Sequence, residues 1–380
     1  MAQQFNILAG KTNTMNTGLT IPFTGLRKQY NNIRTEILNA TDEVLRSGQL
    51  MNGNYTAEFE NWLARKNKVK YAVTCHSGTG ALECIAEYYA THPKTPLPPT
   101  VLIPTLTYAA TANAFMRAGW DVHLIDTDNH GLLDVHRIPD MRYDAVVLMG
   151  LYGASVTHLG TARIWEDWLY KDVTVIEDGA QHWLSAKCQR IGEACAVSFD
   201  PMKNLPCYGN GGAVLTDNND LLHFARAWRD NGKSSHQSTG TNSRMSEIDC
   251  AHMMIKTRHI DAWQARRKQI AEYWVGRLKS SGIKSLIDDS NAHTHAFHKF
   301  VVYTDKRDIL QRNLTLRKIE TKIHYIQPLH EIGVYRSLPG PDILAASSSL
   351  SRGVLSLPIY PELSDLEVEY IIDQVLDSSS

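Results

Sequence analysis

From about residue 69, short apolar runs alternate along the chain with segments whose apolar residues recur at helical spacing. The apolar runs have the length of buried strands, and the segments between them are long enough for helices that connect parallel strands. The alternation therefore predicts βαβ units and a mostly parallel sheet that is covered on both faces. The expected strands are KYAVTC (70–75), TVLIPT (100–105), WDVHLIDTD (120–128), YDAVVLMG (143–150), VTVIED (173–178) and GAVLT (212–216), and the expected helices are TGALECIAEYYATH (79–92), YAATANAFMRAG (108–119) and GTARIWEDWLY (160–170).

The pattern changes after residue 216, where helical segments dominate and a smaller α+β part follows them. The expected elements are a helix that includes LLHFARAWRD (221–230), a long amphipathic stretch from about 246 to 280, the strand FHKFVVYT (297–304), the helix RDILQRNLTLRK (307–318) and a last helix DLEVEYIIDQVLD (365–377). The expected organisation is a flexible leader (1–19), a large α/β domain (20–250), and a long helix with a small C-terminal α/β domain (251–380).

Composition and charge narrow the class of protein. The chain of 380 residues is long enough for two or three domains, and its 43% hydrophobic and 21% charged residues are ordinary globular values. A net charge of −1 leaves no broad basic surface for nucleic acid, and no apolar run approaches the roughly 18 residues of a membrane span. The polar start of the chain lacks the charged and apolar segments of a signal peptide, so none is expected.

Cysteine and histidine spacing favours neither disulfides nor a metal site. The cysteines are scattered without a C-x-x-C pair, which favours a reducing, cytoplasmic compartment. His293, His295 and His298 stand close together, but no cysteine or carboxylate cluster joins them, so a loop or strand edge is the preferred interpretation. The cysteines are Cys75, Cys84, Cys188, Cys195, Cys207 and Cys250.

Three short segments place polar residues where a parallel sheet binds its ligands, beyond the carboxyl ends of the strands. The turn HSGTGAL after Cys75 leads into a helix whose free N–H groups suit a phosphate, although helix capping alone would explain it. Asp178 ends the strand VTVIED, either as an N-cap or as a carboxylate with a buried partner. Lys203 lies between an apolar run and a glycine cluster, either as a surface lysine or as an amine that burial makes reactive.

These three features together predict pyridoxal 5′-phosphate as the cofactor. Its phosphate needs an anchor, its pyridine nitrogen needs a carboxylate, and its aldehyde forms a Schiff base with a lysine. The turn that follows Cys75 meets the first need, Asp178 meets the second, and Lys203 meets the third. Tyr108 follows the strand TVLIPT at a place suited to an aromatic face over the cofactor ring, although it could equally pack in the core.

A series of motifs from about residue 20 to 375 resembles the DegT/DnrJ/EryC1/StrS aminotransferases, fold type I enzymes that use pyridoxal phosphate on nucleotide-linked keto sugars. Each motif is weak by itself, and the order of all of them carries the resemblance. They are IPFTGLRKQYNNIRTEI, SGQLMNGNYTAEFE, SGTGAL, PTLTYAATANAFMRAG, IEDGAQ, SFDPMKNL, GNGGAVLTD, GTNSRMSEIDCA, IETKIHY and SLPIYPELSD.

The resemblance implies a fold, an assembly and a role for each matching residue. The implied fold has a mostly parallel seven-stranded sheet and a smaller C-terminal α/β domain, in a homodimer with shared active sites. Lys203 would hold the cofactor aldehyde, Asp178 would face the pyridine nitrogen, Gln181 the 3′-hydroxyl, and Tyr108 would stack on the ring. Gly78, Thr79 and Ser198 would hold the phosphate, Asn242 would reach the phosphate in the partner subunit, and His324 and Tyr325 would approach the sugar.

Three positions depart from the family pattern. The family commonly has aspartate at the position of Gly80 and histidine near Gly150, and it often has histidine at the position of Asn231. None of these departures removes Lys203 or Asp178. They leave the cofactor prediction in place and bear on the substrate and the rate.

The resemblance implies transfer of an amino group from glutamate or glutamine to the keto sugar, with two alternatives. Related sugar dehydratases carry histidine in place of the lysine, so Lys203 favours transamination. A non-catalytic sensor that binds the cofactor or a sugar nucleotide would also be compatible with the three departures. Neither the sugar, the nucleotide nor the aminated carbon follows from the sequence.

Overall fold

The computed structural model describes residues 19–92, 98–156, 167–168, 170–185, 192–233, 239–341 and 344–378. Residues 1–18 of the predicted leader, most of the helix predicted at 160–170, and Cys188 lie outside the described residues. None of the helices in the described ranges is long and apolar enough to cross a membrane.

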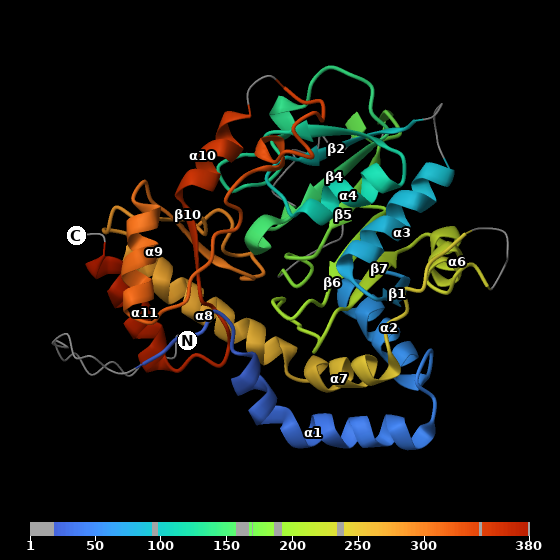
Figure 1. Cartoon of the computed structure of the whole chain (residues 1–380), viewed down its shortest axis with the longest axis horizontal. Coiled ribbons are helices and arrows are strands. Elements are labelled where there is room, and N and C mark those ends of the chain that lie inside the picture. Colours follow the sequence, from blue (N-terminus) through green and yellow to red (C-terminus); the bar gives the residue numbers. More distant parts are fainter. Residues whose placement is uncertain are drawn as a thin grey trace.

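A seven-stranded sheet forms the centre of the larger part of the molecule, with strand order β1-β7-β6-β5-β4-β2-β3 (Figure 1). Neighbouring strands are parallel except at β7, which runs antiparallel to both β1 and β6. The predicted α/β class and mostly parallel sheet are therefore confirmed. The strands are β1 (Tyr71–Cys75), β2 (Thr100–Pro104), β3 (Asp121–Ile125), β4 (Ala145–Met149), β5 (Thr174–Asp178), β6 (Ala194–Ser198) and β7 (Gly212–Thr216).

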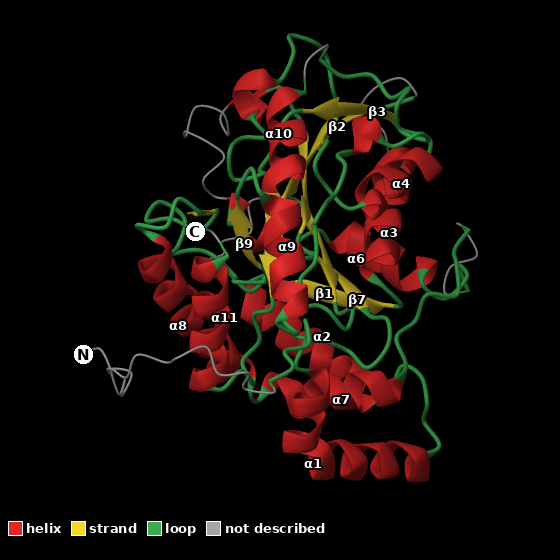
Figure 2. Ribbon diagram, turned by 60° about the vertical axis from the view of Figure 1, so that its left-hand side comes forward, coloured by secondary structure: helices red, strands yellow, loops and turns green. Residues whose placement is uncertain are grey.

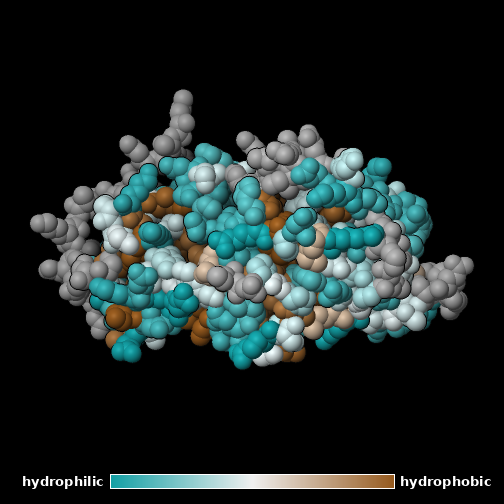
Figure 3. Space-filling model, turned by 90° about the horizontal axis from the view of Figure 1, so that it is seen from above, coloured by the Kyte–Doolittle hydropathy of each residue, from teal (hydrophilic) through white to brown (hydrophobic). Residues whose placement is uncertain are grey.

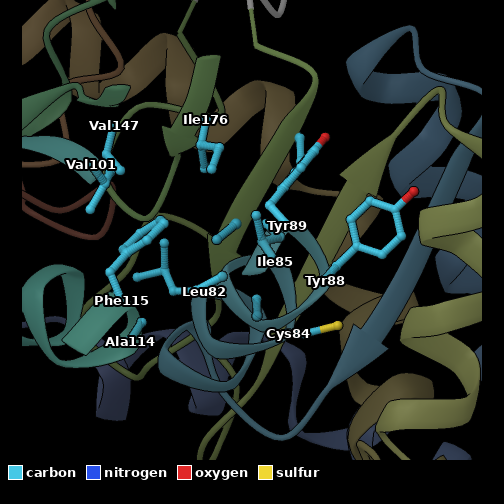
Figure 4. Close-up of a cluster of buried hydrophobic side chains, with 14 of the residues drawn as sticks. Leu82, Cys84, Ile85, Tyr88, Tyr89, Val101, Ala114, Phe115, Val147 and Ile176 are labelled. Carbon is cyan, nitrogen blue, oxygen red and sulfur yellow. The ribbon is translucent and has the colours of Figure 1, made fainter. Parts of the chain in front are cut away.

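Helices α3 (Gly78–Thr91), α4 (Ala109–Arg117) and α6 (Asn219–Trp228) lie together on one side of the sheet (Figure 2). Their apolar side chains pack with alternate residues of the strands, as Figure 4 shows for Leu82 and Phe115 beside Val147. The intervening strand residues, such as Val146, point into a second cluster on the opposite face. Because both faces are buried, the strands read as continuous apolar runs in the sequence.

The opposite face near β1, β6 and β7 is covered by α2 (Asn54–Asn67) and α7 (Glu247–Thr257). Helix α1 (Leu26–Ser47) runs along α7 on the outside of the molecule (Figure 1). Its buried residues recur every three or four positions and meet α7, which is the spacing of one helix face. These contacts join Ile33, Ile37, Ala40 and Val44 of α1 to Ala251 and Ile255 of α7.

The stretch expected as one long helix from 246 to 280 is divided into α7 and α8 (Ile260–Leu278). At the division, Arg258 and His259 donate their N–H groups to carbonyls only three residues earlier, at 3.2 and 3.0 Å. This tighter turn ends α7, and a new helix then begins at Ile260. Helix α7 therefore packs on the large sheet, whereas α8 supplies side chains to the smaller core.

The smaller core surrounds a three-stranded antiparallel sheet of order β10-β9-β8, which lies to one side of the large sheet (Figure 1). Trp274 of α8 is fully buried there, stands edge-on to Phe300, and donates its indole N–H to the carbonyl of Val368 at 3.0 Å. The predicted domain boundary near residue 250 stays a prediction. Ile21, which was assigned to the large domain, belongs to the smaller core, and α7 runs across residue 250. The remaining elements are β8 (Lys284–Ser285), β9 (Phe300–Tyr303), α9 (Arg307–Leu316), α10 (Ala345–Gly353), β10 (Val354–Leu357) and α11 (Asp365–Asp377), with short 3₁₀ turns at Val135–Arg137, Leu151–Gly153 and Leu329–Glu331.

The outer surface is mixed in character. Hydrophilic residues cover most of the face shown in Figure 3, and hydrophobic residues appear there as separate small areas. The cysteines within the described ranges are buried; they are Cys75, Cys84, Cys195, Cys207 and Cys250.

Replacing Trp274 by alanine should destabilise the smaller core, because the change leaves a large cavity and removes the partner of the Val368 carbonyl. We expect a loss of about 3–5 kcal/mol in the free energy of unfolding, measured in urea. Trp274→Phe keeps most of the apolar contact and should lose less. Equal losses in both variants would contradict this view of the core.

Candidate active site

A cavity of about 380 Å³ opens at the carboxyl edge of the parallel strands, where polar residues follow β1, β5 and β6. All but one of the residues predicted from the sequence line this cavity, and the exception is Asn242. Lining the cavity are Gly78, Thr79, Tyr108, Asp178, Gln181, Ser198, Lys203, His324 and Tyr325. The cavity thus brings together described segments that are separated by nearly 250 positions in the sequence, as the topology of a parallel sheet requires.

The turn between β1 and α3 forms one end of the cavity. Ser77 caps α3 by accepting the N–H of Gly80 at 3.0 Å, and the first two residues of the helix, Gly78 and Thr79, line the cavity. Gly78 approaches the end of β6 so closely that an added Cβ would lie 2.6 Å from the Cβ of Ser198. At Gly212, where β7 begins, an added Cβ would lie 2.3 Å from the carbonyl carbon of Ser77.

Asp178 ends β5 and is almost completely buried, with 3% of its surface exposed. Its carboxylate accepts the hydroxyl of Thr111 at 2.8 Å and the N–H of Ala180 at 3.1 Å. These two bonds hold the carboxylate in place at the cavity lining, and within the described ranges no ion pair joins it to a cation. A protonated pyridine nitrogen is the kind of partner that such a carboxylate lacks.

Lys203 is held by a tight turn that follows β6. Asp200 organises this turn, because its carboxylate accepts the N–H of Met202 and its carbonyl accepts the N–H of Lys203, both at 2.8 Å. Burial lowers the pKa of the Lys203 amine, while Asp178 and Asp200 act in the opposite direction. A lysine whose pKa is lowered by burial has a larger fraction of neutral amine, which is the form that attacks a carbonyl or accepts a proton.

The wall opposite the turn is built from aromatic and amide groups. Gln181 accepts the N–H of Tyr152 at 2.7 Å and donates to the hydroxyl of Tyr325 at 3.3 Å. The hydroxyl of Tyr152 in turn donates to the carbonyl of His324. Tyr108 is 60% exposed, and its ring centroid lies 6.2 Å from that of Tyr325, so two aromatic faces border the opening.

The sequence analysis missed four titratable residues that also line the cavity, Asp200, His298, Lys299 and Lys322. His298 was considered only as part of a histidine cluster, yet it is buried and its Nδ1 lies 3.2 Å from the Asn204 side-chain oxygen. Among the described residues, no group of three His, Cys, Asp or Glu side chains is arranged to hold a metal ion. The available signal in the sequence was the position of His298 and Lys299 directly before the apolar strand β9, because two basic residues rarely adjoin a buried strand.

Asn242 lies away from the cavity of its own chain. It is exposed, and its backbone forms an isolated bridge with Asp230. The predicted contact with the partner subunit's cofactor therefore stays a prediction.

The structure gives a physical reason for the departure at Gly150. An added Cβ there would lie 2.2 Å from the carbonyl oxygen of Ala154 and 2.4 Å from the Cγ of His182, so this backbone accepts only glycine. The fully buried imidazole of His182 occupies the space, accepting the Gly150 N–H at 3.1 Å and donating to Glu177 at 3.1 Å. A histidine ring thus stands beside residue 150 but comes from another segment.

The other two departures also have local explanations. An added Cβ at Gly80 would lie 3.0 Å from the hydroxyl of Ser243, which leaves little room for a longer side chain. Asn231 has a φ of 57°, a left-handed conformation that asparagine adopts more readily than most residues. Neither position alters the geometry of Lys203 or Asp178.

The cavity fits pyridoxal phosphate on several independent observations. Its lining includes the amino end of a helix behind a close glycine contact, a buried carboxylate, and a lysine whose pKa is lowered by burial. Together with the seven-stranded sheet, these features define a fold type I, pyridoxal-phosphate-dependent transferase.

Comparisons with known proteins identify the family. Residues 31–376 match the model of the DegT/DnrJ/EryC1/StrS aminotransferase family. The chain is 33% identical over 368 residues to dTDP-3-amino-3,4,6-trideoxy-alpha-D-glucose transaminase of Streptomyces venezuelae, which covers 93% of this chain and 95% of that protein. It is 29% identical over 375 residues to the Pleiotropic regulatory protein of Geobacillus stearothermophilus, with coverage of 94% and 98%. The chain belongs to the DegT/DnrJ/EryC1/StrS aminotransferase family.

A solved structure agrees with this assignment. S. venezuelae DesV, in complex with a ketimine intermediate, has a TM-score of 0.87 at 30% identity and covers 95% of this chain and 99% of its own. The predicted family, fold class and cofactor are thereby confirmed. The roles of the individual site residues stay predictions.

Replacing Gly212 by alanine should weaken cofactor binding by about 10- to 100-fold, because the new methyl group would push the Ser77–Gly78 backbone away from Ser198. The affinity for pyridoxal phosphate can be measured by absorbance titration. Gly209→Ala is a matched control in the same loop, since an added Cβ there meets nothing within 4 Å. Equal affinities in the two variants would contradict the importance of this contact.

Proposed function

We propose that this protein transfers an amino group from glutamate or glutamine to a keto sugar attached to a nucleotide, giving an amino sugar nucleotide. The observation that carries the proposal is the meeting of Lys203 and Asp178 in one cavity at the carboxyl edge of the sheet. Relatives with this family fold support the substrate class, because they are named as transaminases of dTDP- and UDP-linked sugars. No particular sugar is assigned.

Each residue at the site has a distinct task in this proposal. When bound, pyridoxal phosphate supplies an aldehyde that holds the amine of the substrate and an electron-poor ring that accepts negative charge. Lys203 takes the proton from the α-carbon of the donor and returns it on the cofactor side, acting as base and then as acid. Asp178 keeps the pyridine nitrogen protonated, and so stabilises the charge that develops.

The surrounding residues position the reactants. Gln181 is held by Tyr152 and Tyr325 and can orient the ring hydroxyl of the cofactor. Tyr108 and Tyr325 border the opening, where they can exclude water from the reacting groups. His324 and Tyr325 are proposed to contact the sugar, and both line the cavity.

We further propose a cytoplasmic homodimer in which Asn242 reaches the cofactor phosphate of the partner subunit. Asn242 is exposed and is not among the residues that line the cavity of its own subunit, which supports this assignment. The scattered cysteines, without a C-x-x-C pair, support a reducing compartment.

The two alternatives are less well supported. A dehydratase of this family would have histidine at the catalytic position, where this chain has Lys203. A sensor is suggested by the name of the Geobacillus stearothermophilus relative, the Pleiotropic regulatory protein. Binding alone, however, needs no lysine whose pKa is lowered beside a buried carboxylate.

The central test is to incubate the protein and pyridoxal phosphate with L-glutamate and a panel of nucleotide-linked keto sugars, and to detect the amino sugar by mass. Lys203→Ala should lower the rate by about 10²- to 10⁴-fold or more, because the proton carrier is lost. Lys203→Arg keeps the positive charge but cannot carry the proton, so it should be similarly slow. Full turnover by either variant would refute the assignment, and a deoxy sugar product would favour the dehydratase.

Asp200→Asn should shift the acid side of the pH–rate profile to lower pH. The neutral amine of Lys203 is the working base, and it is lost as the pH falls through its pKa. Asp200 raises that pKa, so removing the carboxylate should lower it, while asparagine can still accept the Met202 N–H. The pH dependence of the glutamate half-reaction measures this shift, and a move toward higher pH would contradict the electrostatic role of Asp200.

A further inference from the structure

Two lysines in the active-site cavity have no task in the proposed mechanism. Lys299 lies at the start of β9, and Lys322 lies on the segment that precedes His324. Both line the same cavity as Lys203. Their ammonium groups lie 4.9 and 5.2 Å from the ring centroid of Phe23, so two distant segments place their charges around one aromatic ring.

Neither lysine has an acidic partner among the described residues. Lys299 is 6% exposed, and no ion pair or side-chain hydrogen bond of its ammonium group occurs within the described ranges. The Lys322 ammonium contacts the thioether sulfur of Met202 at 3.7 Å. A buried ammonium without a counter-charge is costly, so a site of this kind is completed by an anion from outside the chain.

The charges around Lys299 reinforce one another. Burial and the neighbouring cations Lys203, Arg267 and Lys322 hold the pKa of Lys299 well below its usual range, and Asp200 opposes them. Arg267 is tied to the backbone, since its guanidinium donates to the carbonyls of Ile359 and Phe297 at 2.6 and 3.4 Å. Both lysines line the cavity beside Lys203, where an incoming ligand can reach them, and an anion that binds there would raise the lowered pKa of Lys299 and favour its charged form.

We propose that Lys299 and Lys322 form a carboxylate-binding subsite that receives the acidic group of a substrate beside Lys203. This inference rests on the proposed aminotransfer. An amino-acid donor carries a carboxylate on the very carbon that Lys203 deprotonates, so the carboxylate must enter the cavity close to that amine. The cofactor phosphate is expected at the opposite feature, the amino end of α3, which leaves the lysine pair for a different anion.

A carboxylate on the keto sugar is the second source of the same chemistry, because donor and acceptor use one cavity in turn. Both sources place an acidic group a few bonds from the reacting carbon. Two ammonium groups over one aromatic ring suit either one, since lysine binds anions as a mobile point charge. Separate experiments on the two half-reactions distinguish the sources.

The test uses Lys299→Met and Lys322→Met in the full-length protein loaded with cofactor. Methionine keeps an unbranched side chain against Phe23 and removes the charge. In the half-reaction with L-glutamate, followed by absorbance, the apparent dissociation constant should rise by about 10- to 100-fold with a smaller change in limiting rate. Lys279→Gln, which removes an exposed lysine at the end of α8, should behave as the unchanged protein does.

In the second half-reaction, a keto sugar with a carboxylate at carbon 6 is compared with its neutral hydroxymethyl counterpart. A weaker response to glutamate in the lysine variants assigns the subsite to the donor, and a lost preference for the acidic sugar assigns it to the acceptor. Unchanged affinities for both glutamate and the acidic sugar in both variants would overturn the proposal. Because Lys322 is half-exposed, its variant carries the test if Lys299→Met fails to fold.

A binding measurement separates this inference from the proposed function. Succinate cannot undergo aminotransfer, so calorimetric titration with succinate reports on the subsite alone. If the unchanged protein shows no turnover but the lysine variants bind succinate more weakly than it does, the proposed function fails and the subsite is supported. Normal turnover with unchanged succinate binding and unchanged glutamate affinity would leave the function standing and remove the subsite.

Discussion

The active site depends on one close approach of backbones at the carboxyl edge of the large sheet. Strand β7 enters antiparallel between β1 and β6, with Gly212 opposite both Cys75 and Ser198. Because Gly212 has no side chain, the Ser77–Gly78 turn folds over it and brings the amino end of α3 against Ser198. The end of the cavity where the cofactor phosphate is expected therefore depends on the strand order as well as on the turn between β1 and α3.

The second organising principle is an uneven distribution of charge within the cavity. Asp178 is hydrogen-bonded but forms no ion pair in the part of the chain that the structure describes, and burial lowers the pKa of Lys203. Lys299 and Lys322 add positive charge without an acidic partner in the described residues. Such incomplete pairs are costly in the empty protein, and cofactor and substrates restore the balance when they bind.

The departures from the family pattern show how local changes are accommodated. The glycine at position 150 leaves a space that the ring of His182 fills, and the buried Glu177 accepts its proton. Because His182 adjoins Gln181, whose amide contacts Tyr152 and Tyr325, the substitution can influence the substrate side without disturbing Lys203.

Apolar periodicity was sufficient to predict the parallel sheet, the last helix α11 and the residues at the strand ends, because these follow from local spacing and burial. It did not predict strand β10, whose short run resembles many loops, or the division between α7 and α8, which depends on packing against two different cores. By itself the sequence determined the class of fold and the cofactor, and it predicted Lys203 and Asp178 as the residues that hold this cofactor. Only the tertiary structure decided that Lys299 and Lys322 share the cavity with them, because contacts between segments so distant in the chain are set by how the two cores pack together.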